Sequence, residues 1–310
     1  MNKIELPLRD TWNKILQRPT QSYEHIEPLV HAVFDSVRKL GDQALKKYTE
    51  EFDGVSLSEI TVSEEEIQSA AGKLDDELIN AIKLAKSNID VFHKAQQTQR
   101  ILVETAPGVQ CWQEKRPIAK VGLYIPGGTA PLFSTILMLA LPAKIAGCKE
   151  IVLCSPPDKS GNLNPAILYT AQLCGVTQIF KVGGIQAIAA MTFGTQSIPK
   201  TYKIFGPGNQ YVTVAKQVAT RYSVAIDMPA GPSELLVVAD DSANAAFVAS
   251  DLLSQAEHGV DSQVILVTTS KTMLEAVEKE IEEQINALPR KAIAEKAIAN
   301  SKLILVNDNR

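Results

Sequence analysis

In the first third of the chain, apolar positions recur at intervals of three and four residues, which predicts helices. Residues 23–51 carry such an amphipathic pattern up to a break that ends at Gly54, and residues 75–97 carry another. Ser63, with Glu66 three positions later, has the spacing of a capping box and predicts a helix start. We therefore expect a helical and polar N-terminal region.

From residue 118 onward, short apolar runs alternate with helical patterns. The predicted strands are 121–126, 150–156, 178–184, 203–208, 234–240, 263–269 and 303–306, and predicted helices include 131–147, 164–175, 244–258 and 271–288. Strands that alternate with helices predict a mainly parallel sheet with helices on both faces. The strands are apolar almost throughout, as strands covered on both faces are.

The last predicted strand, LILV at 303–306, is followed only by Asn307 to Arg310. A series of alternating strands and helices that stops there leaves its last strand without a following helix. The pattern leaves two interpretations open. One is an edge strand at a natural terminus, and the other is a truncated chain.

Composition narrows the class of protein. The 310 residues suggest about two domains, and 45% hydrophobic with 21% charged residues is typical of a globular protein. A net charge of −4 argues against nucleic-acid and anionic-membrane partners. The N-terminus has no signal-peptide pattern, and no apolar run is long enough to span a membrane. The four cysteines form no CxxC pair, so we expect no zinc ribbon and a cytoplasmic location with reduced thiols.

Four predicted strands end at turns rich in glycine. These turns are Pro126-Gly127-Gly128-Thr129, Val182-Gly183-Gly184, Gly206-Pro207-Gly208-Asn209 and Gly231-Pro232-Ser233. Ligands of open α/β sheets bind at the carboxyl ends of the strands, where glycine allows close approach. Tight turns between strands and helices need glycine in any case, and none of the four completes the dinucleotide fingerprint. The turns therefore favour a ligand site without identifying the ligand.

The sequence SQAEHG at 254–259 places a glutamine among the apolar positions of a predicted helix. On a helical wheel, Gln255 falls in the middle of the apolar face, one turn before His258. A glutamine oxygen and an imidazole nitrogen at this spacing could reach one zinc ion. A histidine in the last turn could instead stabilise the helix end, and a catalytic zinc needs at least three protein ligands. Both interpretations stay open on these residues alone.

Five stretches of the chain match a known family. They are VGLYIPGGTAPLFST (121–135), VGGIQAIAA (182–190), IFGPGNQYV (204–212), IDMPAGPSE (226–234) and ASDLLSQAEHGVDSQVILVT (249–268). With them the chain resembles histidinol dehydrogenase from its N-terminus to residue 310, and it looks truncated before the family's C-terminal catalytic part. The resemblance implies oxidation of L-histidinol to L-histidinaldehyde and then to L-histidine. NAD accepts a hydride each time, and zinc holds the substrate.

The resemblance also implies an α/β fold of two Rossmann-like domains, like those of aldehyde dehydrogenases, one inserted in the other. Residues 1–117 would form a helical N-terminal region and the start of the first α/β domain. Residues 118–233 would form the inserted domain on the NAD side, and 234–310 the incomplete continuation of the first domain on the zinc side. The family forms an intertwined homodimer.

Residue roles carry over by matching motifs. Gln255 and His258 match zinc ligands that also contact substrate, and Ser233 matches a substrate contact. The NAD contacts match Tyr124, Gln186 and Asn209. The Glu-His pair that serves as general acid and base, an Asp ligand and a His ligand from the partner subunit would lie beyond residue 310. We therefore expect residues 1–310 alone to lack turnover and to bind zinc poorly.

Three other interpretations remain. A thiol aldehyde dehydrogenase would use Cys154 as its nucleophile, although a small buried residue is the better explanation of that cysteine, because free cysteines are among the most buried residues. A non-catalytic NAD-binding or assembly protein could descend from the enzyme. A fragment cut from the complete enzyme shares every residue with that second interpretation, so the sequence does not separate the two.

Overall fold

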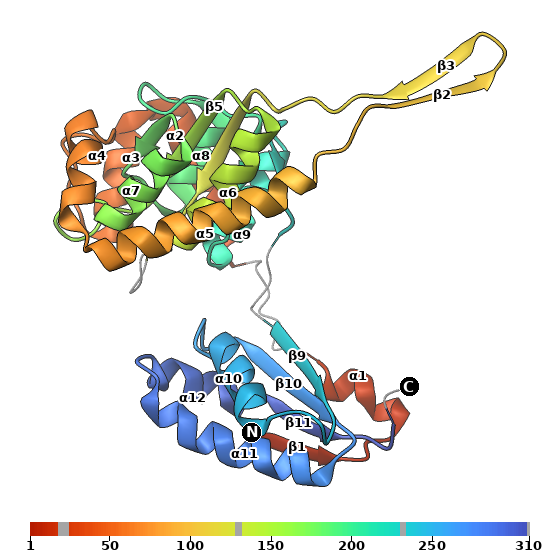
Figure 1. The fold of residues 1–310 in the computed structure, drawn as a ribbon. Coiled ribbons are helices and arrows are strands. Elements are labelled where there is room, and N and C mark those ends of the chain that lie inside the picture. Colours follow the sequence, from red (N-terminus) through yellow and green to blue (C-terminus); the bar gives the residue numbers. More distant parts are fainter. Residues whose placement is uncertain (18–24, 128–131, 230–233, 309–310) are drawn as a thin grey trace. The chain divides into compact units, whose positions relative to one another are not determined.

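The computed structural model describes residues 1–17, 25–127, 132–229 and 234–308 (Figure 1). Internal contacts group the chain into two units. The first unit is Met1–Ser22 with Gly231–Arg310, and the second is Tyr23–Ala230. Both are α/β units whose main sheets are parallel, and the second is inserted in the sequence of the first. The predicted fold class is confirmed, while the inserted unit begins much earlier than residue 118.

The second unit contains a five-stranded parallel sheet in the order β6-β5-β4-β7-β8. Its strands are β4 (Lys120–Tyr124), β5 (Glu150–Cys154), β6 (Gln178–Phe180), β7 (Lys203–Phe205) and β8 (Ala225–Ile226). The chain runs outward from β4 to β6, returns to the other side of β4 and continues from β7 to β8. The direction reverses between β4 and β7, which makes this the topological switch point of the sheet.

Helices cover both faces of this sheet, as predicted (Figure 1). One face carries α2 (Glu27–Leu40), α3 (Asp42–Tyr48), α8 (Gly184–Phe193) and α9 (Gln210–Thr220). The other carries α4 (Glu64–Ala70), α5 (Asp76–Ala95), α6 (Phe133–Ala146) and α7 (Pro165–Cys174). Alternate residues along β4 and β5 enter two separate hydrophobic cores, which explains why these strands are apolar throughout.

The N-terminal helices pack into the second unit. Phe34 of α2 is fully buried, and its ring lies 5.7 Å from that of Phe193 and 6.1 Å from that of Tyr222, centroid to centroid. Helix α5 packs against α6 on the opposite face. This packing is the physical reason why the contacts start the inserted unit at Tyr23.

The predicted capping box at the start of α4 is present. The Ser63 hydroxyl accepts from the Glu66 N–H at 3.2 Å, and the Glu66 carboxylate accepts from the Ser63 N–H at 2.9 Å. Lys181 forms an ion pair with the same carboxylate at 2.6 Å. Burial acts to raise the pKa of Glu66, but the bonds from Lys181 and Ser63 outweigh it and hold that pKa below its usual value.

We expect Glu66→Gln to lower the free energy of unfolding by about 1 kcal/mol at pH 7. Because the folded pKa is depressed, this contribution is present above the unfolded pKa and is lost as the pH falls through the folded pKa. Urea unfolding of both proteins from pH 7 to pH 3 measures the difference. Glu65→Gln, at an exposed position of the same turn, is the control. A Glu66→Gln effect that is constant over this range would contradict the expectation.

A two-stranded antiparallel hairpin was not predicted. Its strands are β2 (Ile101–Ala106) and β3 (Val109–Gln113), and among the residues that the structure describes they pair only with each other (Figure 1). All of its residues are exposed, and Leu102 and Trp112, which face each other across the strands, are 54% and 58% exposed. An isolated hairpin of this kind is marginally stable in water.

The first unit contains a four-stranded parallel sheet in the order β1-β11-β10-β9. The strands are β1 (Asn2–Glu5), β9 (Glu234–Ala239), β10 (Gln263–Thr268) and β11 (Lys302–Leu305). The interpretation of the last strand as an edge strand is wrong, because β1 pairs with the outer side of β11. The N-terminus of the chain supplies the edge.

Helices α10 (Ala245–Ala256), α11 (Lys271–Gln284) and α12 (Lys291–Ala299) pack on one face of this sheet and share one core. A short helix, α1 (Trp12–Ile15), follows β1. On the other face of β9, Leu236 and Val238 are 60% and 57% exposed. The sequence predicted helices on both faces of each strand. Within the described residues, helices cover only one face of β9. None of the helices described is long and apolar enough to cross a membrane.

Candidate functional site

The glycine-rich turns of the second unit pack closely at the carboxyl edge of its sheet. A Cβ atom added to Gly127 or to Gly183 would lie 2.4 Å from the ring of Pro156. At Gly206, where φ is +133°, a Cβ atom would lie 2.1 Å from the carbonyl oxygen of Tyr124. Only glycine fits at these contacts. The turns after β4, β5, β6 and β7 therefore form one continuous edge.

Tyr124 ends β4 and borders the switch point. Its side chain is 4% exposed, and its hydroxyl oxygen accepts from the Gly184 N–H at 3.2 Å. Burial raises the pKa of Tyr124 to about 12, against a smaller lowering by the Gly184 bond. The phenol therefore stays neutral at neutral pH. Because its oxygen accepts from Gly184, its hydroxyl hydrogen can be donated to a ligand.

Gln186 lies in the first turn of α8 and is fully buried. Neither atom of its amide group has a hydrogen-bond partner among the described residues, and the same holds for the hydroxyl of Ser155, directly after β5. Leaving such a group unpaired costs about 1–3 kcal/mol. Unpaired polar atoms at a ligand-binding edge indicate a missing partner. Ser155 was not singled out from the sequence, although a hydroxyl directly after the apolar run EIVLC was a usable signal.

Asn209 begins α9. Its side-chain oxygen accepts from the Val212 N–H at 3.1 Å, so it caps the helix. Asn209 itself is exposed. With Tyr124 and Gln186, it completes the three residues predicted to contact NAD, and the topology places all three at the carboxyl edge of one sheet.

Gln255 lies in the last turn of α10, and His258 follows two residues after the helix ends, before β10 begins. The buried row of α10 consists of Val248, Ala249, Leu252, Leu253 and Ala256. Gln255 is half-buried beside this row, and His258 is exposed. The prediction that Gln255 is central on the apolar face is therefore wrong. The wheel counted Phe247 as core, whereas Phe247 is 73% exposed.

The residues near α10 fit only part of a zinc centre. Gln255 and His258 lie three residues apart and offer an amide oxygen and an imidazole nitrogen. No group of three or more His, Cys, Asp or Glu suited to a metal occurs in the parts of the chain that the structure describes. Ser233, the predicted substrate contact, lies outside the described residues.

Comparison with known proteins identifies the family. Residues 16–310 match the family model described as Histidinol dehydrogenase. A relative from Bacteroides thetaiotaomicron with this name is 59% identical over 308 residues, which cover 99% of this chain and 72% of the relative. The chain belongs to the histidinol dehydrogenase family.

Other members of the histidinol dehydrogenase family agree. The relative from Escherichia coli K12 is 54% identical over 298 residues, or 95% of this chain and 68% of the relative. The crystal structure of histidinol dehydrogenase from Elizabethkingia anophelis is 55% identical with a TM-score of 0.97, covering 99% of this chain and 71% of that chain. The predicted resemblance is confirmed, and the chain spans about seven tenths of these relatives.

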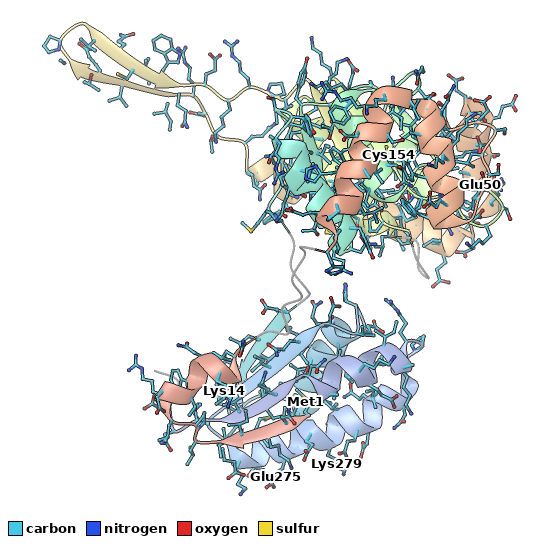
Figure 2. All side chains as sticks on the ribbon, turned by 180° about the vertical axis from the view of Figure 1, so that it is seen from behind. Met1, Lys14, Glu50, Cys154, Glu275 and Lys279 are labelled. Atoms are coloured by element: carbon cyan, nitrogen blue, oxygen red, sulfur yellow. The ribbon has the colours of Figure 1, made fainter. Side chains whose placement is uncertain are left out.

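The position of Cys154 argues against a thiol nucleophile in this member of the histidinol dehydrogenase family. Its side chain is fully buried inside the second unit (Figure 2). Burial also raises the pKa of the Cys154 thiol far above its ordinary value. The thiolate is the nucleophilic form, so this sulfur is both inaccessible and protonated.

We expect Cys154 in the native chain to react with iodoacetamide at least about a hundredfold more slowly than Cys111. Cys111 is exposed and serves as the internal control. Peptide mass spectrometry after timed labelling measures both rates. Equal labelling of the two residues under native conditions would show that Cys154 is accessible and would revive the thiol mechanism.

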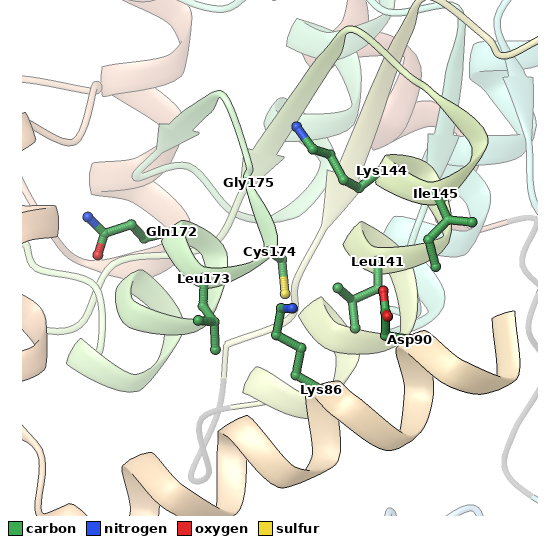
Figure 3. Close-up of a pocket in the computed structure, with 9 residues that line it drawn as sticks. All are labelled: Lys86, Asp90, Leu141, Lys144, Ile145, Gln172, Leu173, Cys174 and Gly175. Atoms are coloured by element: carbon green, nitrogen blue, oxygen red, sulfur yellow. The ribbon is translucent and has the colours of Figure 1, made fainter. Parts of the chain in front are cut away.

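A hollow on the second unit lies away from the carboxyl edge of its sheet. It has a volume of about 250 Å³ and is lined mainly by residues of α5, α6 and α7, among them Lys86, Lys144 and Cys174 (Figure 3). It opens where α6 and α7 end, just before β5 and β6 begin. This is the amino edge of the sheet, opposite the edge where ligands of such sheets bind.

Proposed function

We propose that this protein takes part in the NAD-dependent oxidation of L-histidinol to L-histidine by way of L-histidinaldehyde. Family membership supports the substrate and the oxidoreductase class. The observation that carries the cofactor assignment is the unpaired amide of Gln186 at a Rossmann-type switch point. We place NAD at the carboxyl edge of the five-stranded sheet.

The residues at this edge have complementary roles in the proposal. NAD, when bound, would accept a hydride in each of the two oxidations. Tyr124 would donate its hydroxyl hydrogen, and Gln186 would offer both a donor and an acceptor. Helix α8 begins at Gly184, and its N-cap Gly183 offers no side chain. The Gly184 N–H donates to Tyr124, so the N–H groups of Ile185 and Gln186 are the ones that would meet a phosphate. Asn209 would hold the start of α9 and offer its amide nitrogen.

The proposed substrate side lies in the first unit. Gln255 and His258 would hold zinc through an amide oxygen and an imidazole nitrogen, and Ser233 would contact the substrate. Zinc, when bound, would hold the imidazole and amine of L-histidinol. A catalytic zinc usually has at least three protein ligands, and the described residues supply two of them, Gln255 and His258. We therefore propose that residues 1–310 bind zinc weakly. Equilibrium dialysis against zinc measures this.

The cofactor assignment is tested by NAD titration in a calorimeter. We expect the unsubstituted chain to bind NAD and Gln186→Ala to bind it at least about tenfold more weakly, because a buried amide would lose its partner. Gln217→Ala, at an exposed position of α9, is the matched control. Equal affinity in both variants and the unsubstituted chain would remove Gln186 from the site.

We further propose that residues 1–310 alone do not turn over L-histidinol. After Glu257-His258 the sequence contains no further histidine, and therefore no second Glu-His pair to act as acid and base. Such groups typically contribute about 10²–10⁴-fold each. Following NADH absorbance with histidinol, NAD and zinc tests this. Normal turnover would contradict the proposal.

The proposed partner is a second copy of the chain. Apolar side chains are half-exposed on both faces of the β2–β3 hairpin, with Leu102 and Trp112 on one face and Val103 on the other. A homodimer would cover them. We expect Leu102→Ser with Trp112→Ser to weaken dimerisation by at least about tenfold in sedimentation velocity. Dimerisation at unchanged strength would show that the hairpin is not the interface.

A further inference from the structure

An ion pair between a buried lysine and a partly buried aspartate binds both backbone polar atoms of Gly206. Lys216 of α9 is 3% exposed and pairs with the carboxylate of Asp227, the residue after β8. The Lys216 ammonium also donates to the Gly206 carbonyl oxygen at 2.8 Å. The Gly206 N–H donates to the second carboxylate oxygen of Asp227 at 2.8 Å. Both polar atoms of this glycine are therefore bound by the same pair.

The ion pair is itself fixed by the sheet. Asp227 donates its N–H to the Ile204 carbonyl oxygen at 3.2 Å, which continues the pairing of β8 with β7. Lys216 extends from α9, whose first turn begins just after Asn209. The pair therefore connects the end of β8, the body of α9 and the turn between β7 and α9. This turn borders the switch point next to Tyr124.

Stability alone does not explain the arrangement. Lys216 is removed from water, and the Asp227 side chain remains only 27% exposed. This cost can exceed the attraction between the two charges, and apolar side chains of similar volume often stabilise such a place equally well. An apolar pair could not bind the two polar atoms of Gly206, however. What the ion pair supplies is a fixed orientation of the two peptide groups that flank the Gly206 Cα atom, at φ +133° and close to the backbone of Tyr124.

We infer that Lys216 and Asp227 are positioning residues for the dinucleotide, because they fix the turn from Gly206 to Asn209 in the shape that the cofactor needs. The inference rests on the proposed NAD site at the switch point. Neither residue has to contact the cofactor. A site residue held by well-packed neighbours binds more tightly because less ordering is needed on binding.

The test uses Lys216→Met and Asp227→Asn in the full chain, with Val218→Ala as the control. Val218 is buried in the same helix but lies in the hydrophobic core, so its truncation destabilises without touching the ion pair. Two quantities are measured well below the Tm of each variant. They are amide hydrogen exchange of residues 206–212 and the Kd for NAD.

We expect both ion-pair variants to raise exchange in residues 206–212 and to weaken NAD binding by about tenfold or more. Val218→Ala should lower the Tm but leave the Kd for NAD unchanged. Unchanged exchange in this segment, or a loosened turn with an unchanged Kd for NAD, would overturn the inference.

The outcomes also separate this inference from the proposed function. An unsubstituted chain that binds no NAD at millimolar concentration would overturn the NAD assignment and the inference with it. An unsubstituted chain that binds NAD no more tightly than the two variants would overturn the inference alone. Weaker binding in both variants but not in Val218→Ala would support both.

Discussion

Gly206→Ala is expected to lower the free energy of unfolding by about 2–5 kcal/mol and to abolish NAD binding. The new methyl group would lie 2.1 Å from the Tyr124 carbonyl oxygen, so the backbone of residue 206 or of Tyr124 would have to move. The φ of +133° is also a conformation that L side chains rarely adopt. Movement would break the two hydrogen bonds to the ion pair. Urea unfolding and NAD titration measure the two effects.

Gly72→Ala is the matched control for this change. Gly72 is exposed, and a Cβ atom added there meets nothing within 4 Å. Alanine at a compatible position typically stabilises by about 0.4–1 kcal/mol through the unfolded state. Similar unfolding free energies for the two variants would mean that the close approach of Gly206 to Tyr124 is not a constraint.

Phe34→Ala is expected to lower the free energy of unfolding of the second unit by about 3–5 kcal/mol. The ring is fully buried among Phe193 and Tyr222, so its removal leaves a cavity between α2 and α8. Hydrogen exchange of β4 and β5, measured as a function of denaturant, reports this unit separately.

Phe92→Ala provides the comparison, because Phe92 lies on α5 and is 64% exposed. We expect it to change stability by less than about 0.5 kcal/mol. The pair tests the boundaries of the inserted unit. If Phe34→Ala left β4 and β5 fully protected, the helices before residue 118 would not be part of that unit.

Elements with local signals were predicted well. The capping box at Ser63, the proline at the start of α7 and Gly175 at its end each act within one helical turn, so the sequence around them is sufficient. Strand β1 was missed because NKIE has one apolar residue and resembles a loop. It becomes a strand by pairing with β11, and no local pattern contains that information.

The residues of the candidate site also fall into those with a local sequence signal and those without one. The glycine turns were visible because a strand followed by glycine is a local pattern. Gln186 and Asn209 came from the family resemblance. Lys216 and Asp227 were missed, although a lysine within the apolar run YVTVAKQVA was a usable signal. The role of Lys216 and Asp227 depends on their hydrogen bonds with Gly206, and only the folded chain brings the three residues together.

The pairing of β1 with β11 also sets an order of events during synthesis. Met1–Glu5 leave the ribosome before the second unit, and Lys302–Leu305 leave it only after the whole second unit has been made. Domains usually fold as they emerge, and contacts between distant residues form late. The second unit should therefore be folded while β1 is still unpaired. A nascent chain arrested before residue 302 would carry an unpaired β1 segment that is open to chaperones and proteases. Protection of this segment would report that Lys302–Leu305 have left the ribosome.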